Sequence, residues 1–264
     1  MTSRDEFQLI AESFNRLVRK LSLYNQRIQK LQDDMIKSAK LATAGQLAAG
    51  LAHEIRNPLS SIKMMAQILR ERYLKGGEGQ NEVLTILSES ERLNDQLKDM
   101  LEFARPSPMQ FGYNDAGEIA NDVLRLFKYN IEHQDIKVSA KLDRSIPPLY
   151  LDRDKIRSAV MNLVINAIQA MPQGGMLEVS IRRHGDSRVL FRFCNSGSKI
   201  APNDLRMIFE PFFTTKQEGT GLGLAIVKMI VERHLGTVEV QSDERSTCFS
   251  IIIPEDLEQQ IQTL

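Results

Sequence analysis

The first candidate for chemistry is a histidine, His53, on the polar side of a predicted helix. At 100° per residue it lies about 180° from the apolar stripe that contains Leu51 and Ile55. Glu54 flanks it, and Asn57 follows one turn later on the same face. A neutral imidazole exposes a lone pair at neutral pH, and a neighbouring carboxylate can accept the proton of the other ring nitrogen. The group could carry nucleophilic chemistry, although a solvated surface histidine without a role is the plainer reading of an isolated residue.

A second candidate is a pair of asparagines, Asn162 and Asn166, which share one helix face at positions i and i+4. An amide carbonyl is a hard oxygen ligand of the kind that Mg²⁺ accepts together with waters and substrate phosphates. Buried asparagines can instead cap a neighbouring loop. Two roles therefore stay open at this point: a magnesium site with Asn166 as ligand, and a structural pair.

A third candidate is a glycine cluster that follows a lysine and opens a predicted helix. Glycines at a helix N-terminus let backbone N–H groups approach anionic oxygens, and the helix dipole favours phosphate there. Lys216 adds a mobile positive charge for a terminal phosphate. The spacing alone is weak evidence, because it lacks the Gly-Lys-Ser/Thr of a P-loop. The candidate binding residues here are Thr215, Lys216, Gly219, Thr220, Gly221, Leu222 and Gly223.

These residues need a scaffold, and beyond Pro108 the sequence alternates short strands with helices. This pattern predicts an α/β sandwich in which helices cover one face of one sheet. We expect strands at 109–113, 136–142, 148–151, 176–183, 188–194, 237–241 and 248–253, and helices at 115–132, 154–171 and 223–234.

Before Pro108 the apolar positions follow helical spacing. Between residues 14 and 35 they step by three and four, which predicts a coiled coil formed by two parallel copies of the chain. A lone amphipathic surface helix is the alternative. Turn residues at 75–80 divide the next stretch into two helices, and two such hairpins make a four-helix bundle.

These motifs resemble those of sensor histidine kinases. The segment 47–59 around His53 resembles their dimerisation and phosphoacceptor segment, and the later motifs follow the order of their ATP-binding domain. The resemblance implies an α+β protein: a long helical hairpin forming a dimeric four-helix bundle, then an α/β sandwich of the histidine-kinase/Hsp90-type ATPase fold. It also implies that His53 is phosphorylated, that Glu54 is its acid/base partner, and that Asn57 orients water for the reverse hydrolysis.

One loop departs from the family's pattern. Where the family commonly has Asp-x-Gly-x-Gly, this chain has Asn195, Gly197 and Lys199. The family's aspartate accepts a hydrogen from the adenine amino group, whereas asparagine keeps one acceptor oxygen but loses the charge. We expect Asn195 and Gly197 still to bind adenine. The Lys199 side chain, which replaces a glycine, is expected to affect loop geometry, and a simple strand-end turn would fit the same residues.

The resemblance divides the chain into six parts. They are the end of a HAMP-like module at 1–20, a coiled-coil signalling helix at 21–40, a dimerisation and phosphotransfer hairpin at 41–105, a linker at 106–109, a catalytic ATP-binding domain at 110–254, and a C-terminal tail at 255–264.

The implied activity is autophosphorylation of a histidine with ATP and Mg²⁺. The phosphoryl group would pass to an aspartate on the receiver domain of a response regulator, with phosphatase activity in the reverse direction. The alternative is a catalytically impaired kinase that acts as a dimeric signalling scaffold, because Asn195 and Lys199 depart from the pattern. A non-kinase ATPase of the same fold is disfavoured by the phosphoacceptor segment.

Composition limits the partners. The 34 basic side chains balance the 34 acidic ones, so no net positive charge favours nucleic acid. The longest apolar runs are short, whereas a helix that spans a membrane needs about 20 apolar residues. The two cysteines lack metal-ligand spacing, and a reducing cytoplasm is expected. We expect a soluble, cytoplasmic portion of an inner-membrane receptor, tied to the membrane only through an N-terminal sensor region that this chain lacks.

Overall fold

The structure is a computed structural model that describes residues 55, 57, 59–70, 80–104, 106–185, 187–216 and 219–263. The predictions on residues 1–54, which include the HAMP-like module, the coiled coil, His53 and Glu54, lie outside the described residues, as does most of the predicted turn at 75–80. The contacts divide the chain into two compact units, the first ending at Asn94 and the second beginning at Asp95.

The described residues of the first unit are helical. Residues 59–70 form one helix, and helix α2, which runs from Gln80 to Ala104, provides the other arm before it continues into the second unit. A small core of Ala66, Val83 and Leu87 joins the two arms. Large apolar side chains remain exposed on both arms, namely Ile55, Ile62, Met64, Met65, Ile68, Leu69, Leu84, Ile86 and Leu93. A single copy of the hairpin therefore leaves much of its apolar surface in contact with water.

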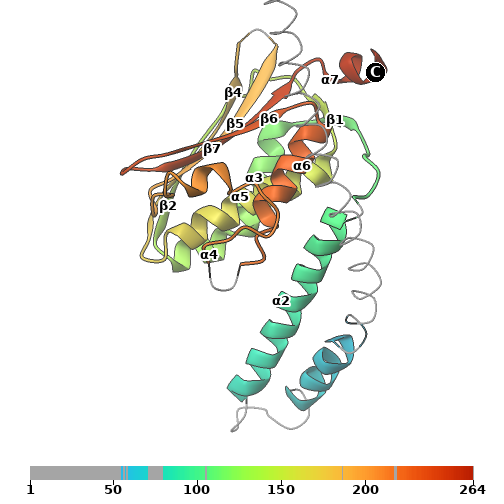
Figure 1. The fold of residues 1–264 in the computed structure, drawn as a ribbon, viewed down its shortest axis with the longest axis vertical. Coiled ribbons are helices and arrows are strands. Elements are labelled where there is room, and N and C mark those ends of the chain that lie inside the picture. Colours follow the sequence, from blue (N-terminus) through green and yellow to red (C-terminus); the bar gives the residue numbers. More distant parts are fainter. Residues whose placement is uncertain are drawn as a thin grey trace, which may run out of the picture. The chain divides into compact units, whose positions relative to one another are not determined.

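The second unit is built on a five-stranded sheet with the order β2-β4-β5-β7-β6 (Figure 1). Strand β2 pairs with β4 in parallel, and the other neighbours are antiparallel. A separate antiparallel pair joins β1 to β3. The strand bounds are β1 Gly112–Asn114, β2 Ile136–Leu142, β3 Leu149–Leu151, β4 Gly175–Arg183, β5 Arg188–Asn195, β6 Thr237–Ser242 and β7 Thr247–Pro254.

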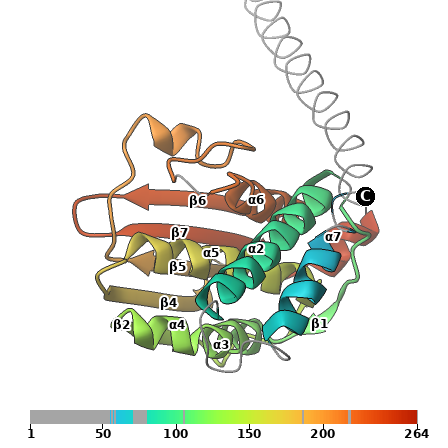
Figure 2. The ribbon, with the colours of Figure 1, turned by 90° about the horizontal axis from the view of Figure 1, so that it is seen from below.

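Helices cover one face of this sheet, as Figure 2 shows for α3, α5 and α6. Alternate strand residues such as Leu177, Val179 and Ile181 are buried beneath them, because side chains along a strand point to opposite faces. The helix bounds are α3 Ala116–Leu126, α4 Lys128–His133, α5 Arg153–Ala170, α6 Gly223–Arg233 and α7 Leu257–Thr263. The predicted α+β class is thus confirmed. None of the described helices has the length and apolarity needed to cross a membrane.

One predicted helix was wrong in its continuity. The sequence predicted a single helix at 115–132, whereas the structure has α3 and α4 on either side of Phe127. Phe127 leaves helical geometry, with φ −91° and ψ 9°, and its side chain packs against the core. Apolar spacing does not report such a break, because both short helices keep the same period.

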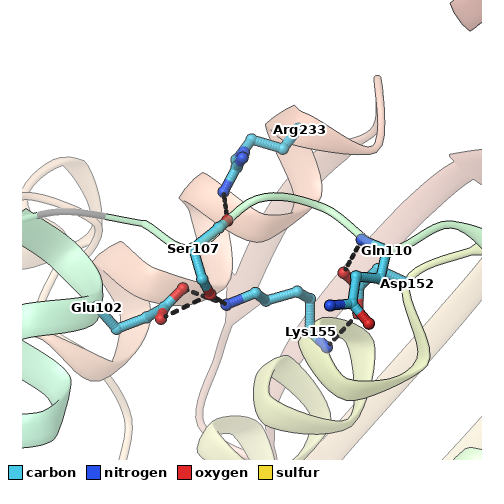
Figure 3. A network of polar contacts seen from close by, with 6 residues as sticks. All are labelled: Glu102, Ser107, Gln110, Asp152, Lys155 and Arg233. Atoms are coloured by element: carbon cyan, nitrogen blue, oxygen red, sulfur yellow. Dashed lines mark hydrogen bonds and ion pairs between the residues drawn. The ribbon is translucent and has the colours of Figure 1, made fainter.

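The segment between α2 and β1 is bonded to two helices of the second unit (Figure 3). Lys155 of α5 donates to the Glu102 carboxylate and, at 2.5 Å, to the Ser107 hydroxyl. Arg233 at the end of α6 donates to the Ser107 carbonyl at 3.0 Å. The predicted linker at 106–109 is therefore held by charged and polar side chains.

A buried polar cluster joins the end of this linker to both helices. Asp152 caps α5 by accepting from the backbone N–H of Lys155 at 3.1 Å, and it also accepts from that of Gln110 at 2.7 Å. His234 Nε2 accepts from the Asp152 N–H at 3.0 Å, and Nδ1 lies 2.8 Å from the Ile230 carbonyl. Asp152 is 3% exposed and His234 is 0% exposed. The start of α5 and the end of α6 therefore share one fixed point.

This cluster predicts that mild acid destabilises the second unit. Burial lowers the pKa of His234, with the Ile230 hydrogen bond and the Asp152 charge acting in the opposite sense. The pKa of a histidine in an unfolded chain is about 6.5, so as the pH falls residue 234 takes up a proton in the unfolded chain before it does so in the folded one. The stability contribution is therefore complete above about pH 6.5 and is lost progressively below it, toward the folded pKa.

Urea unfolding at about pH 5 and about pH 8 measures this loss. The variant His234→Gln should lose less stability between the two pH values than the parent does. The matched variant His184→Gln, at an exposed position, should keep the parental difference. An unchanged difference in His234→Gln would contradict the assignment.

Candidate functional site

Helix α5 provides one wall of the candidate site. Its apolar side is buried against the sheet and the neighbouring helices. Asn162 and Asn166 are half-buried, and Gln169, one turn beyond Asn166, is exposed. The helix is thus held by its apolar side, and a line of side-chain amides remains available on another side.

The glycine cluster reaches α5 because α6 is packed beside it in a fixed register. Asn162 lies ten residues after Asp152, and Gly223 lies eleven residues before His234. At 1.5 Å per residue both are about 15 Å from the buried cluster in which Asp152 and His234 meet. A Cβ on Gly223 would lie 3.4 Å from Asn162 Oδ1. The cluster therefore sets where the start of α6 meets α5.

The N-terminus of α6 is suited to an anion. Its N-cap residue is Leu222, and no side chain caps the helix. The first N–H groups of a helix have no partner inside the helix, so here they remain for a ligand. Thr220 Oγ1 accepts from the Leu222 N–H at 3.3 Å, just outside this end. The absence of a Cβ on Gly223 leaves backbone accessible between the helix end and Asn162.

Lys216 contacts the second asparagine. Its ammonium donates to Asn166 Oδ1 at 3.0 Å and to Gln169 Oε1 at 2.5 Å. Lys216 is exposed overall, but partial burial of its ammonium beside α5 lowers the pKa of Lys216. Asn166 Oδ1, which the sequence predicts to be a metal ligand, therefore accepts a hydrogen bond from the Lys216 ammonium in this structure. Gln169 was not predicted from the sequence, although its position three residues after Asn166 on the same helix was an available signal.

The loop after β5 contacts the end of α5. Asn195 is 3% exposed; with its amide oriented so that the nitrogen faces Thr247, it donates to the Thr247 carbonyl and accepts from the Gly197 N–H, both at 3.1 Å. Gly197 lies so close to α5 that a Cβ would be 2.2 Å from the Ala170 carbonyl oxygen. Only glycine fits at that position.

The departure at Lys199 has a simple structural outcome. Its ammonium forms an ion pair with Glu244 at 2.5 Å and is exposed. The backbone N–H of the next residue, Ile200, donates to Ser242 Oγ at 2.9 Å. The Lys199 side chain is thus accommodated by a neighbouring turn, while Gly197 keeps its close contact with α5.

Three segments therefore contact α5 one after another along its length. From the middle of the helix to its end, the contacts are Gly223 with Asn162, Lys216 with Asn166 and Gln169, and Gly197 with Ala170. Thr215 is exposed beside Lys216. His53 and Glu54 lie outside the described residues, and Asn57 is an exposed helical residue of the first unit.

This arrangement fits a nucleotide with a hard metal ion. Among the described residues, no group of three or more His, Cys, Asp or Glu side chains could hold a metal. A metal here would depend on an amide oxygen and on oxygens brought by the ligand, which suits Mg²⁺ bound to phosphates. The open N-terminus of α6 and the Lys216 ammonium are both complementary to phosphate.

Two family models match the chain. Residues 151–257 match the model described as histidine kinase-, DNA gyrase B-, and HSP90-like ATPase, and residues 43–108 match the His Kinase A (phospho-acceptor) domain. The chain is 39% identical over 230 residues to the sensor histidine kinase ZraS of Escherichia coli K12. This match covers 87% of the chain and 49% of ZraS. The chain thus spans about half the length of the curated relatives it matches.

Solved structures are similar as well. The catalytic domain of the histidine kinase ThkA is 32% identical with a TM-score of 0.54, and the match covers 57% of this chain and 99% of that domain. ThkA in complex with the response regulator protein TrrA is 27% identical with a TM-score of 0.63, and the match covers 87% of this chain and 67% of that chain.

The close approach of Gly221 generates a stability prediction. Gly221 has φ +68°, and a Cβ there would lie 2.4 Å from the Phe212 carbonyl carbon. Gly185 has nearly the same φ, +66°, but nothing within 4 Å. Gly185→Ala should cost about 1 kcal/mol through backbone strain, whereas Gly221→Ala should cost about 1–3 kcal/mol more through overpacking.

Urea unfolding measures the two losses, and hydrogen exchange of the Phe212 amide, which donates to the Gly221 carbonyl, reports on the local contact. Equal losses together with unchanged Phe212 exchange would show that the close contact does not restrain this segment.

Proposed function

Because this chain belongs to the two-component sensor histidine kinases, we propose that it binds Mg-ATP along α5 and transfers the γ-phosphoryl group to His53. The observation that carries this proposal is the convergence of an uncapped helix end, a lysine ammonium and two asparagine amides on one side of α5. Phosphoryl transfer depends mainly on alignment and on neutralising charge, and these groups supply both.

Each part of the site takes one part of the nucleotide. Asn195 would accept the adenine amino hydrogen with the remaining lone pair of its side-chain oxygen, and Gly197 keeps that loop close to α5. The N–H groups at the start of α6 would bind phosphate oxygens, with Gly219, Thr220 and Gly221 shaping the approach.

Asn166 would hold Mg²⁺, which when bound neutralises charge on the phosphates. Lys216 would then leave the Asn166 oxygen and turn to the terminal phosphate, while Gln169 remains a second acceptor for its ammonium. Asn162 lies beside the phosphate end at Gly223, and Thr215 flanks Lys216.

The acceptor belongs to the other unit. His53 would attack the γ-phosphorus through a ring nitrogen, and Glu54 would take the proton from the other nitrogen. Asn57 is exposed and helical, and it follows His53 by four residues in the sequence, so its amide could hold a water for hydrolysis of a phosphoaspartate. This supports phosphatase activity as the reverse function. A catalytically impaired scaffold is less well supported, because Lys199 is accommodated without disturbing the Gly197 contact.

The partners follow from the same proposal. A second copy of the hairpin would cover the exposed apolar side chains of the first unit, which gives a homodimer with a four-helix bundle. The receiver domain of a response regulator would accept the phosphoryl group, and the complex of ThkA with TrrA supports this partner class. Because ATP is available in the cytoplasm, the chain would act in that compartment, as the cytoplasmic portion of a membrane receptor.

The experiment is incubation of the intact chain with γ-labelled ATP and magnesium. We expect acid-labile label in the parent and in His184→Ala, and none in His53→Ala, which should still bind ATP. Acid-labile label in His53→Ala at the parental level would contradict the acceptor assignment.

Asn57→Ala should keep the label but lose most dephosphorylation of the partner; equal loss of both activities would indicate a structural role for Asn57.

A further inference from the structure

The two cysteines of the chain, which no proposed role so far uses, lie directly opposite each other. Cys194 of β5 and Cys248 of β7 are partners in the antiparallel register, form a disulfide, and have Cα atoms 4.0 Å apart. A reducing cytoplasm was expected from the sequence, which gave no sign of this pairing, because the two strands that bring the cysteines together are separated by 54 residues.

The pair faces a hollow on the side of the sheet away from the core. Phe193 is buried in the core, so Cys194, the next residue, points to the opposite face. Both cysteines line a hollow of about 430 Å³. Three cations, Lys141, Arg192 and Arg245, and one carboxylate, Glu178, line it too. Arg192 Nε is buried and has no hydrogen-bond partner among the described residues.

The cysteine pair is also adjacent to the loop 195–199, which we propose binds adenine. The next pair in the register is Asn195 with Thr247, and the Asn195 amide donates to the Thr247 carbonyl at 3.1 Å. The Thr247 hydroxyl lies 3.4 Å from the Ser198 carbonyl of the same loop. A change at the cysteine pair is therefore one residue away from the contacts that position Asn195.

We propose that Cys194 and Cys248 form a reversible thiol–disulfide site whose redox state sets the affinity for ATP. This inference rests on the proposed function, because a kinase that uses cytoplasmic ATP works where thiols are kept reduced. In that compartment a disulfide is usually transient and redox-sensing. The hollow favours an anionic exchange partner such as glutathione, because its lining has three positive charges and one negative charge.

Glutathione disulfide would oxidise the pair in two exchange steps. The Cys194 thiolate attacks a sulfur of glutathione disulfide, which breaks that S–S bond and releases one glutathione thiolate. The Cys248 thiolate then attacks the Cys194 sulfur, closes the protein disulfide and releases the second glutathione. The two protons of the protein thiols end on the two glutathione thiols, and two electrons pass from protein to glutathione. Cys194 attacks first because Cys248 is only 6% exposed.

The redox state of the cysteine pair would change the position of Asn195 through the distance between strands β5 and β7. Two bonded sulfurs need only about 2 Å, whereas two thiol sulfurs need roughly 3.5 Å or more. With Cα atoms 4.0 Å apart, reduction must turn a side chain into the hollow or separate the strands beside Asn195 and Thr247. The oxidised form should therefore hold the adenine contact better, by roughly two- to tenfold in ATP affinity, the range of one neutral hydrogen bond.

Thiol counting tests the site itself. The intact chain is equilibrated in glutathione buffers from reducing to oxidising, alkylated, and weighed by mass spectrometry. We expect two alkylated cysteines in reducing buffer and none in oxidising buffer, with the chain free of covalent dimers. In the variant Cys248→Ser, Cys194 should retain one glutathione, and Cys248 in Cys194→Ser should react more slowly. Two alkylated cysteines at every buffer ratio, or covalent dimers instead of an internal disulfide, would overturn the proposal.

Calorimetric titration with a magnesium complex of a non-hydrolysable ATP analogue tests the coupling. The oxidised parent should bind more tightly than the reduced parent, and the double variant Cys194→Ser with Cys248→Ser should bind equally in both buffers. Equal affinity of the two parental forms would overturn the regulatory part. Absence of binding in every form would instead contradict the proposed function and with it the nucleotide half of this inference, while the thiol count still decides the redox half.

Discussion

The buried contact between Asp152 and His234 is the constraint on which the candidate site depends. Through it the first residue before α5 and the residue after α6 are bonded to each other, and Gln110 joins the linker to the same carboxylate. Two helices that share a fixed point and pack side by side must also meet in a fixed register further along. The contact of Gly223 with Asn162, about 15 Å away, is the consequence that matters for function.

Helix α5 then acts as the support for the three segments around it. Its apolar side is held in the core, so its amide-bearing side cannot rotate away without exposing residues such as Leu163 and Val164, which are 1% and 0% exposed. The loop after β5, Lys216 and the start of α6 each contact a different part of this helix. A ligand that spans the three contacts would break the hydrogen bond between Lys216 and Asn166, and a negative charge on the ligand would then pair with the Lys216 ammonium. Such a site is formed before the ligand binds, and only this one bond has to be replaced.

Local elements of the fold were predictable from the sequence, whereas the contacts that join distant segments were not. Strand β4 and the shared face of Asn162 and Asn166 followed from local periodicity, because the buried residues Leu177, Val179 and Ile181 alternate along β4. The structural role of His234 did not, because a histidine at the end of a helix has no local signal for a partner 82 residues away. The Cys194–Cys248 pair was missed for the same reason. The break at Phe127 was missed because the apolar period continues across it.

We infer that nucleotide binds along α5 between the three segments that contact this helix. Hydrogen exchange of the intact chain, followed by mass spectrometry with and without Mg-ATP, tests it most directly. We expect slower exchange in the loop 195–199 and in residues 219–226 at the start of α6, with strand β2 unchanged. Unchanged exchange in both segments at saturating Mg-ATP, or protection of β2 instead, would contradict it.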